Sequence, residues 1–353
     1  MLDRHTMADR YRHILSPEDR ARLPLYSALC DALAESDVAL DILRTAAERH
    51  QNPTLILAIL HYVALRGHPT LAPLYDDVRQ GREVEVEHFV STVLAALHAE
   101  PELVRRELHR STQTNEPNRS AVLARVIGDV AASEGWMHIN LIDVGCSMGL
   151  NLYPDFVRIA DRDDGEPSTL VSECRTPGYQ PSRVPVIEQR IGIDANPLDP
   201  RRSDDVLWLE ACIWPEESRR FERFAAIVAQ AQTWPEPERI QGDAVDTLDH
   251  VLFGVSGPTV VVNSWILAYL RPEERSRYRE MLDRHFATRD DLAWIAFEHP
   301  SLNEALGFDA ARPPVDYFGS TAVTVTTSNR PSTHWGWCHP HGHWFSVASG
   351  PKA

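Results

Sequence analysis

The chain has 353 residues, of which 43% are hydrophobic and 24% are charged, and its formal net charge at pH 7 is −16. This composition is typical of a globular protein with one large or two ordinary domains. The negative charge disfavours general nucleic-acid binding, which requires a basic surface. No apolar run approaches the roughly 20 residues that span a bilayer, and residues 1–14 are too charged for a secretory signal. We therefore expect a cytoplasmic protein that binds neither nucleic acid nor membrane.

The cysteines are scattered without Cys-x-x-Cys spacing, at Cys30, Cys146, Cys174, Cys212 and Cys338. This pattern is typical of reduced cytosolic thiols and gives no zinc signature. Cys146 lies within a glycine-rich turn. Packing of a small side chain is favoured there over a reactive thiol.

Residues 1–112 are predicted to be helical. Apolar side chains recur at helical intervals through residues 23–43 and again through residues 55–65. Ser16-Pro17 is typical of a helix start, and Asn52-Pro53 separates two helices. We therefore expect a helical N-terminal domain or lid.

From residue 120 onward, predicted strands alternate with predicted helices. One amphipathic helix is expected at residues 120–132 and another at residues 208–214, ending at Pro215. The predicted strands are Asn140–Val144, Gln189–Ile193, Arg239–Gln241, Thr259–Asn263, Leu292–Phe297, Ala322–Thr326 and Trp344–Val347. This alternation favours an α/β fold over residues 113–353, with a doubly wound, mostly parallel sheet and helices on both faces. Residues 153–188, rich in proline and charge, are predicted to be an insertion.

The segment LIDVGCSMGLN, residues 141–151, has the pattern of a strand, a tight turn and a helix. The apolar run ends at Asp143, and small residues follow at Gly145, Ser147 and Gly149. Such a turn brings backbone N–H groups up to a nucleotide-like ligand. Glycine is needed there because a Cβ would block the turn or the ligand.

Three later strands also end in polar residues. Asp194 stands where a carboxylate can accept hydrogen bonds from a ribose diol. Asp243 stands where an acid can meet an adenine amino group. A third strand delivers Asn263, Ser264 and Trp265 to the carboxyl edge of the sheet, where open α/β sheets bind ligands.

This order of motifs over roughly residues 120 to 300 resembles the class I S-adenosylmethionine (AdoMet)-dependent methyltransferases. The resemblance implies a Rossmann-like core that binds S-adenosyl-L-methionine. Two departures are Ser147, which replaces the middle glycine of the turn, and Asp194, which lies farther than about 20 residues beyond the turn. The resemblance matches Asp143, Gly145, Ser147, Gly149, Asp194 and Asp243 to the family's motifs. Asn151, Asn196, Ala244 and Asn263 are also predicted to bind the cofactor.

Further motifs extend the likeness to nearly the whole chain. QTNEPNR at residues 113–119, DVGCSMGLNLYPD, GIDANPLD, WLEACIWPE and the late HPHGHW resemble a bacterial family known only as a domain of unknown function. That family combines a helical N-terminal part with a methyltransferase-like core. The chain is more loosely similar to actinobacterial sugar O-methyltransferases that make methylated mannose polysaccharides.

A dinucleotide ligand is disfavoured by the spacing of the turn. The dinucleotide fingerprint requires three glycines as G-x-G-x-x-G, whereas the turn here reads G-x-S-x-G. A sulfonium nucleoside has no phosphate and needs no helix N-terminus as an anion site. Acidic residues suit its sulfonium charge, amino group and diol.

Transfer of a methyl group to a hydroxyl requires a base beyond the carboxyl ends of the strands. His299 and Glu298 follow an apolar run, and Glu116 lies in the polar segment just before the core. We expect these three residues to act in catalysis, although a helix-capping histidine and a plain polar loop are alternatives. Residues expected to contact the acceptor are Asn115, Arg119, Ser264 and Trp265.

Residues 334–344 read HWGWCHPHGHW, with four histidines and three tryptophans. A metal site would use several of the imidazoles. The favoured interpretation is a hairpin with stacked aromatic rings and no metal, because the spacing lacks a zinc pattern and acidic magnesium ligands are missing nearby. Tryptophan faces also stack on sugar rings.

The leading functional hypothesis is an AdoMet-dependent O-methyltransferase that acts on a small polar acceptor, such as a sugar hydroxyl of a mannoside or polysaccharide precursor. The alternatives are a non-catalytic nucleotide-binding or partner-binding module and an NAD or flavin oxidoreductase. The sequence leaves open the acceptor, a requirement for a divalent metal, and whether the chain forms a homodimer.

Overall fold

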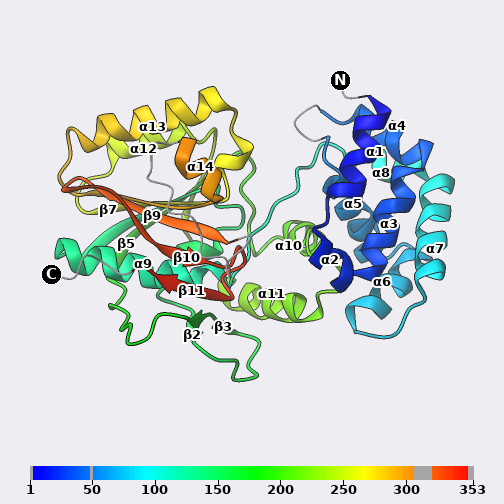
Figure 1. Ribbon diagram of the computed structural model, residues 1–353, viewed down its shortest axis with the longest axis horizontal. Coiled ribbons are helices and arrows are strands. Elements are labelled where there is room, and N and C mark those ends of the chain that lie inside the picture. Colours follow the sequence, from blue (N-terminus) through cyan, green and yellow to red (C-terminus); the bar gives the residue numbers. More distant parts are fainter. Residues whose placement is uncertain (1–2, 48–50, 306–319, 349–353) are drawn as a thin grey trace. The chain divides into compact units, whose positions relative to one another are not determined.

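The computed structural model describes residues 3–47, 51–305 and 320–348 and divides the chain into two compact units (Figure 1). The first unit spans Met1–Thr114 and Arg201–Ala225, and the second spans Asn115–Pro200 and Ala226–Ala353. Within the described ranges, no helix has the length and apolar character needed to cross a bilayer.

Helices build the first unit. They are α1 (Arg4–His13), α2 (Pro17–Arg22), α3 (Pro24–Ala34), α4 (Asp37–Thr45), α5 (Pro53–Leu65), α6 (Leu71–Arg79), α7 (Val86–Ala99), α8 (Pro101–Arg105), α10 (Ser203–Ala211) and the start of α11 (Ser218–Ala231). The predicted helix starts are confirmed, because Ser16 Oγ accepts from Asp19 N and Asn52 Oδ1 accepts from Thr54 N, each at 3.1 Å.

The segment 201–225 was assigned from the sequence to the second domain, but the structure groups it with the helical unit. Trp208 of α10 is buried, and its Nε1 donates to Ser111 O at 3.1 Å. His61 Nδ1 hydrogen-bonds to the carbonyl oxygens of Ala211 and Ile213 at 3.2 and 3.1 Å. These contacts to α5 and its neighbours explain the grouping. The helix also ends at Ala211 rather than at Pro215.

The second unit contains a nine-stranded sheet in the described part of the chain, with the order β4-β11-β10-β9-β8-β7-β1-β5-β6. Strands β8, β7, β1, β5 and β6 run parallel, and β9 and β10 continue antiparallel. The strands are β1 (His138–Val144), β4 (Glu173–Cys174), β5 (Val186–Asp194), β6 (Glu238–Gln241), β7 (Thr259–Ser264), β8 (Leu292–Glu298), β9 (Thr321–Thr327), β10 (Arg330–Cys338) and β11 (Trp344–Val347). The mixed α/β class and every strand predicted from the sequence are confirmed.

Helices cover both faces of this sheet. Figure 1 shows α12 (Asp246–Gly254) and α13 (Pro272–Phe286) over one face and α9 (Arg119–Glu134) over the other, with α14 (Pro300–Ala305) following β8. Leu248 and Leu282 pack with Ile142 and Ile193 in one buried cluster. Strands β7 and β8 are buried almost throughout, as expected for strands that are covered on both faces.

The predicted insertion lies between β1 and β5. Its strands β2 (Arg158–Ala160) and β3 (Thr169–Val171) pair with each other, and β4 pairs with β11 at the edge of the main sheet. The excursion therefore leaves β5 free to pair in parallel with β1, in register from His138 opposite Val186.

The order of the parallel strands places a switch point at β1. From β1 the chain continues to β5 and β6 on one side, and then returns to β7 and β8 on the other. At such a point the connections leave β1 and its neighbour in opposite directions. Because open α/β sheets commonly bind ligands there, the carboxyl ends of β1, β5 and β7 are the candidate site.

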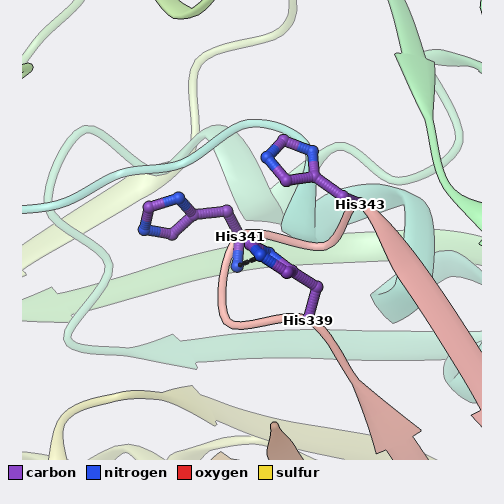
Figure 2. A group of neighbouring side chains, drawn as sticks. All are labelled: His339, His341 and His343. Carbon is purple, nitrogen blue, oxygen red and sulfur yellow. Dashed lines mark hydrogen bonds between the residues drawn. The ribbon is translucent and has the colours of Figure 1, made fainter. Parts of the chain in front are cut away.

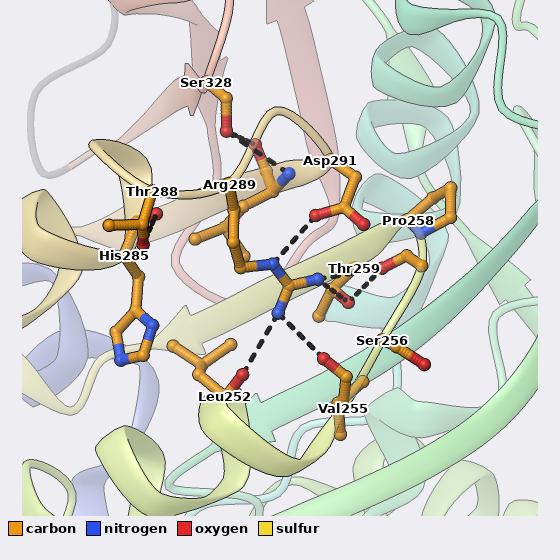
Figure 3. Close-up of polar contacts among 12 residues, drawn as sticks. Leu252, Val255, Ser256, Pro258, Thr259, His285, Thr288, Arg289, Asp291 and Ser328 are labelled. Atoms are coloured by element: carbon orange, nitrogen blue, oxygen red, sulfur yellow. Dashed lines mark hydrogen bonds and ion pairs between the residues drawn. The ribbon is translucent and has the colours of Figure 1, made fainter.

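The opposite edge of the sheet is held together by Arg289. Figure 3 shows its guanidinium between the start of β7, the start of β8 and the end of α12. Its Nε donates to Asp291 Oδ1 at 2.8 Å, and its terminal nitrogens donate to Thr259 Oγ1 and to three backbone carbonyls, those of Leu252, Val255 and Gly257. The side chain is only 14% exposed, so its removal would leave these carbonyl groups without their donor.

We expect Arg289→Ala to lower the free energy of unfolding by about 3 kcal/mol, because a mostly buried charge with several acceptors is lost. Arg284→Ala is the control, since that side chain is 63% exposed in a surface ion pair and its loss should cost less than about 0.5 kcal/mol. Urea denaturation measures both. Equal effects of the two substitutions would contradict this role of Arg289.

Candidate functional site

The glycine-rich turn follows β1 and has three residues in the left-handed region. Gly145, Ser147 and Gly149 have φ values of 77°, 52° and 78°. The amide of Gly145 donates to Ile193 O at 2.8 Å, which fixes the turn against β5. Ser147 thus adopts the glycine-like conformation that its position in the motif requires.

A helix was expected directly after this turn, and that prediction is wrong. The chain forms one turn of 3-10 helix, η2 (Leu150–Leu152), before Pro154. The amide of Leu150 donates to Asn115 Oδ1 at 3.1 Å, and Asn151 Oδ1 accepts from Ser120 Oγ at 2.9 Å. These two hydrogen bonds hold the chain after the turn against residues near the start of α9. In addition, Pro154 disfavours helical backbone in the residue before it.

Asp194 at the end of β5 lies beside the turn, as the sequence predicts. Its Oδ2 accepts from Ser147 N and its Oδ1 accepts from Asn196 N, both at 2.8 Å. Asn196 therefore contacts the Asp194 carboxylate through its backbone amide. Each carboxylate oxygen can accept a further hydrogen bond, and the side chain is only half-buried.

Asp143, the last acid of β1, is buried with only 2% exposure. Among the described residues, its Oδ2 has no hydrogen-bond partner. Burial raises the pKa of Asp143 to about 8, the charge of Asp194 adds to the rise, and Arg119 opposes it. A carboxyl group in this position is stabilised by any cation that reaches it.

Glu298, at the end of β8, is fully buried. Its Oε1 accepts from Asn263 Nδ2, Ile266 N and Leu267 N at 2.8, 3.0 and 3.1 Å. Burial raises the pKa of Glu298 to about 7, against the lowering by these donors and by Arg119. The geometry therefore makes Glu298 a group that positions the chain after β7.

Asn263, predicted to bind the cofactor, is also fully buried. Its Oδ1 accepts from Trp294 Nε1, and its Nδ2 donates to Glu298. With both ends of the amide engaged inside the protein, Asn263 supports the site from within.

Arg119, predicted to contact the acceptor, is 5% exposed. Its Nε donates to Pro340 O at 2.7 Å and its Nη1 donates to Ser264 Oγ at 3.2 Å. Its charge also favours ionisation of Asp143 and Glu298. The structure thus gives Arg119 a second role, as a buried cation that offsets two carboxyl groups.

Two further residues before the core are buried as well. Asn115 donates to Cys146 O at 3.4 Å and accepts from Leu150 N, so it braces the turn. Glu116 is 3% exposed, and its Oε1 accepts from Asn118 N at 3.3 Å, close to the start of α9. The predicted roles of Asn115 at the acceptor and of Glu116 as a base stay predictions.

His299, by contrast, is exposed. Its Nδ1 accepts from Ser301 N at 3.3 Å and lies 2.8 Å from Ser301 Oγ, at the start of α14. This is the capping arrangement that the sequence left open as an alternative. The centroid of its ring lies 6.4 Å from the ring centroid of Trp265. Trp265 has a φ of 60°, and its buried Nε1 has no partner among the described residues.

The acid after β6 is exposed. Asp243 Oδ1 accepts from Val245 N and Asp246 N at 2.7 and 2.9 Å, at the start of α12. Ala244 beside it packs against the core cluster.

Cys146 is fully buried, and burial raises the pKa of its thiol, which agrees with the packing role expected for it.

The C-terminal segment forms the predicted hairpin, because β10 and β11 pair antiparallel. Strand β10 itself was not predicted. Figure 2 shows that the loop between the strands brings His339, His341 and His343 together. His334 lies on β10, and its ring centroid is 4.6 Å from that of Trp337. Burial lowers the pKa of His339 to about 4, and His343 adds to the lowering.

A family model described as "Uncharacterized protein conserved in bacteria (DUF2332)" matches residues 8–347. The chain belongs to the DUF2332 family. The predicted membership of a bacterial family of unknown function is thereby confirmed. No curated protein and no solved structure matches this DUF2332 chain, so its likeness to methyltransferases stays a prediction.

The packing of the turn generates a first prediction about the site. A Cβ on Gly145 would lie 1.9 Å from Ile266 Cγ2, whereas a Cβ on Gly165, whose φ is similar at 84°, would meet nothing within 4 Å. Both alanine variants should lose about 1 kcal/mol to backbone strain. We expect Gly145→Ala to lose about 2 kcal/mol more through overpacking.

Chemical denaturation measures this difference. Adding Ile266→Ala to Gly145→Ala should restore part of the loss, because the two side chains compete for one space. Equal costs at Gly145 and Gly165, or no coupling to Ile266, would contradict the close approach.

A second prediction follows from Asp143. An unfolded aspartate has a pKa of about 3.9, so the folded protein keeps this proton over a range in which the unfolded chain has lost it. The stability that the proton contributes is complete below the unfolded pKa and is lost as the pH rises toward about 8. Asp143→Asn cannot ionise.

We therefore expect the free energy of unfolding of Asp143→Asn, relative to that of the unmodified protein, to increase with pH across this range, by at most about 1.4 kcal/mol per pH unit. Urea denaturation over a pH series measures the slope. Asp283→Asn, at an exposed position of α13, is the control and should show no such trend. Parallel curves for Asp143→Asn and the unmodified protein would refute the assignment.

Proposed function

We propose that this protein is an AdoMet-dependent O-methyltransferase whose cofactor lies at the carboxyl ends of β1, β5 and β7. The observation that carries the proposal is backbone strain at the switch point. Within the described ranges, the non-glycine residues with positive φ are Ser147 and Trp265. They follow the neighbouring strands β1 and β7, and such conformations cluster at functional sites.

The charges at this edge support a cationic nucleoside. AdoMet carries a sulfonium, an ammonium group and a ribose diol. Asp194, held in place by Ser147 N and Asn196 N, is oriented to accept from the diol. The buried carboxyl of Asp143 would gain stability from a nearby cation, since its pKa is raised mainly by burial.

The same edge is poorly suited to a pyrophosphate. Dinucleotide sites place the pyrophosphate at a helix N-terminus, where free amides and the helix dipole attract anions. Here the turn leads into the single turn η2, and the amide of Leu150 is used by Asn115. The missing helix therefore favours a ligand without phosphate and argues against the oxidoreductase alternative.

The reaction would be an in-line displacement. The acceptor oxygen attacks the methyl carbon, the carbon–sulfur bond breaks, S-adenosylhomocysteine leaves, and a base takes the hydroxyl proton. Among the three predicted bases, the exposed one is His299. A small polar acceptor such as a sugar hydroxyl fits this proposal, with the ring of Trp265 as a stacking surface.

Calorimetry with S-adenosylhomocysteine tests cofactor binding. We expect saturable binding, and we expect Asp194→Asn to weaken it by about 10- to 100-fold, because a charge-assisted hydrogen bond is worth roughly 1.5–3 kcal/mol. Asp283→Asn again serves as the control and should bind as the unmodified protein does. Circular dichroism confirms that each variant is folded.

Absence of binding at high micromolar ligand would refute the proposal, as would binding that Asp194→Asn leaves unchanged. Binding with no methyl transfer to any of a panel of glycosides would instead support the non-catalytic alternative. The non-catalytic alternative is kept because Glu298 and Glu116, two of the three predicted bases, are buried.

A further inference from the structure

Three histidines converge in the short loop between β10 and β11. His339, His341 and His343 alternate along the chain, and one ring nitrogen from each lies within 4.8 Å of the others. The first two side chains are half-buried and the third is exposed, so the cluster is open to solvent on one side. Figure 2 shows all three side chains leaving this one loop.

The loop is fixed by the protein around it. His339 N donates to Trp344 O at 2.9 Å, and Gly342 N donates to His339 O at 2.8 Å. On its other side, Asn118 Nδ2 donates to Gly342 O at 3.0 Å, and Arg119 Nε donates to Pro340 O at 2.7 Å. The backbone that carries the imidazoles is therefore preorganised before any ligand arrives.

Gly342 shows how close this packing is. Its φ is 73°, and a Cβ there would lie 2.4 Å from Asn118 O. The glycine between His341 and His343 therefore reflects a tight loop with no room for a side chain at that position.

The three imidazoles also lie against one another in the loop. The ring pairs that stabilise the hairpin lie on the strands, where Trp335 stacks on Phe345 at 5.9 Å and His334 lies on Trp337. In the loop, His339 and His343 lie with ring centroids 4.6 Å apart, although His343 is exposed. Nitrogen ligands gathered at a solvent-accessible position are the pattern of a metal site.

We propose that His339, His341 and His343 bind a late first-row divalent cation, with Zn²⁺ as the reference ion. Imidazole suits zinc, copper and nickel, whereas magnesium prefers oxygen ligands. Nitrogens on a tetrahedral zinc lie about 3.4 Å apart, so small side-chain rotations close the cluster onto the ion. The site goes beyond methyl transfer and does not depend on it.

Three protein ligands leave the fourth position for water or for an oxygen of a bound molecule. This arrangement is typical of catalytic zinc sites, whereas structural sites have four protein ligands.

Binding through His339 would change a hydrogen bond that the structure shows. His339 Nδ1 accepts from His341 N at 2.9 Å. A metal on Nδ1 would displace this bond, and a metal on Nε2 would move the ring proton to Nδ1 and break it. We therefore expect the backbone amide resonance of His341 to shift when the cation binds.

The test uses the full-length protein without an affinity tag, freed of metal with a chelator. Calorimetry with Zn²⁺ and visible absorption with Co²⁺ should both show one tight site per chain. We expect His341→Ala and His343→Ala each to weaken binding tenfold or more. The control His250→Ala removes an exposed histidine on α12 and should leave the affinity unchanged.

Circular dichroism and thermal melting verify that each variant is folded, and His343→Gln offers a milder change at the exposed position. Absence of stoichiometric Zn²⁺ binding would overturn the proposal. Binding that is equally strong in the His341 and His343 variants would also overturn it, because the ion would then lie on other residues. Neither result bears on S-adenosylhomocysteine binding, which is measured separately.

Discussion

A buried cation connects several segments of the second unit. Arg119, at the first position of α9, holds the loop after β10 through Pro340 and the end of β7 through Ser264. Its charge also opposes the rise in pKa of two buried acids, Asp143 and Glu298. Burying an ionised carboxyl group is costly, and the nearby guanidinium reduces this cost.

The strands could be predicted because a parallel sheet covered on both faces needs continuous apolar runs. Strands β7 and β8 are such runs, and they were located from the sequence to within two residues. Strand β10 was missed for the opposite physical reason. Its first six residues are mostly polar and half-exposed, with a proline and a histidine, and pairing with β9 stabilises it. Tertiary pairing of this kind leaves no local signal.

Several roles of the predicted site residues could not be read from the sequence. An acid at a strand end has the same sequence pattern whether its side chain is half-buried, as that of Asp194 is, or fully buried, as that of Glu298 is. The difference depends on long-range contacts, such as the three donors that surround Glu298 Oε1. The absence of a helix after the turn likewise depends on Asn115, thirty-five residues away from Leu150. Pro154 was the one local signal that could have revealed it.

The arrangement of the three histidines also could not be predicted from the sequence. The spacing of the histidines has no zinc-site pattern, which is why the sequence favoured a hairpin without a metal. The tight loop at Gly342 brings the three ring nitrogens together.

The segment Asn115–Arg119 then contacts both features, because Asn115 braces the turn and Asn118 and Arg119 hold the loop. A ligand that shifts this segment at one end would change the support at the other. Any such effect on affinity must be reciprocal, since it is a free energy shared by the two sites.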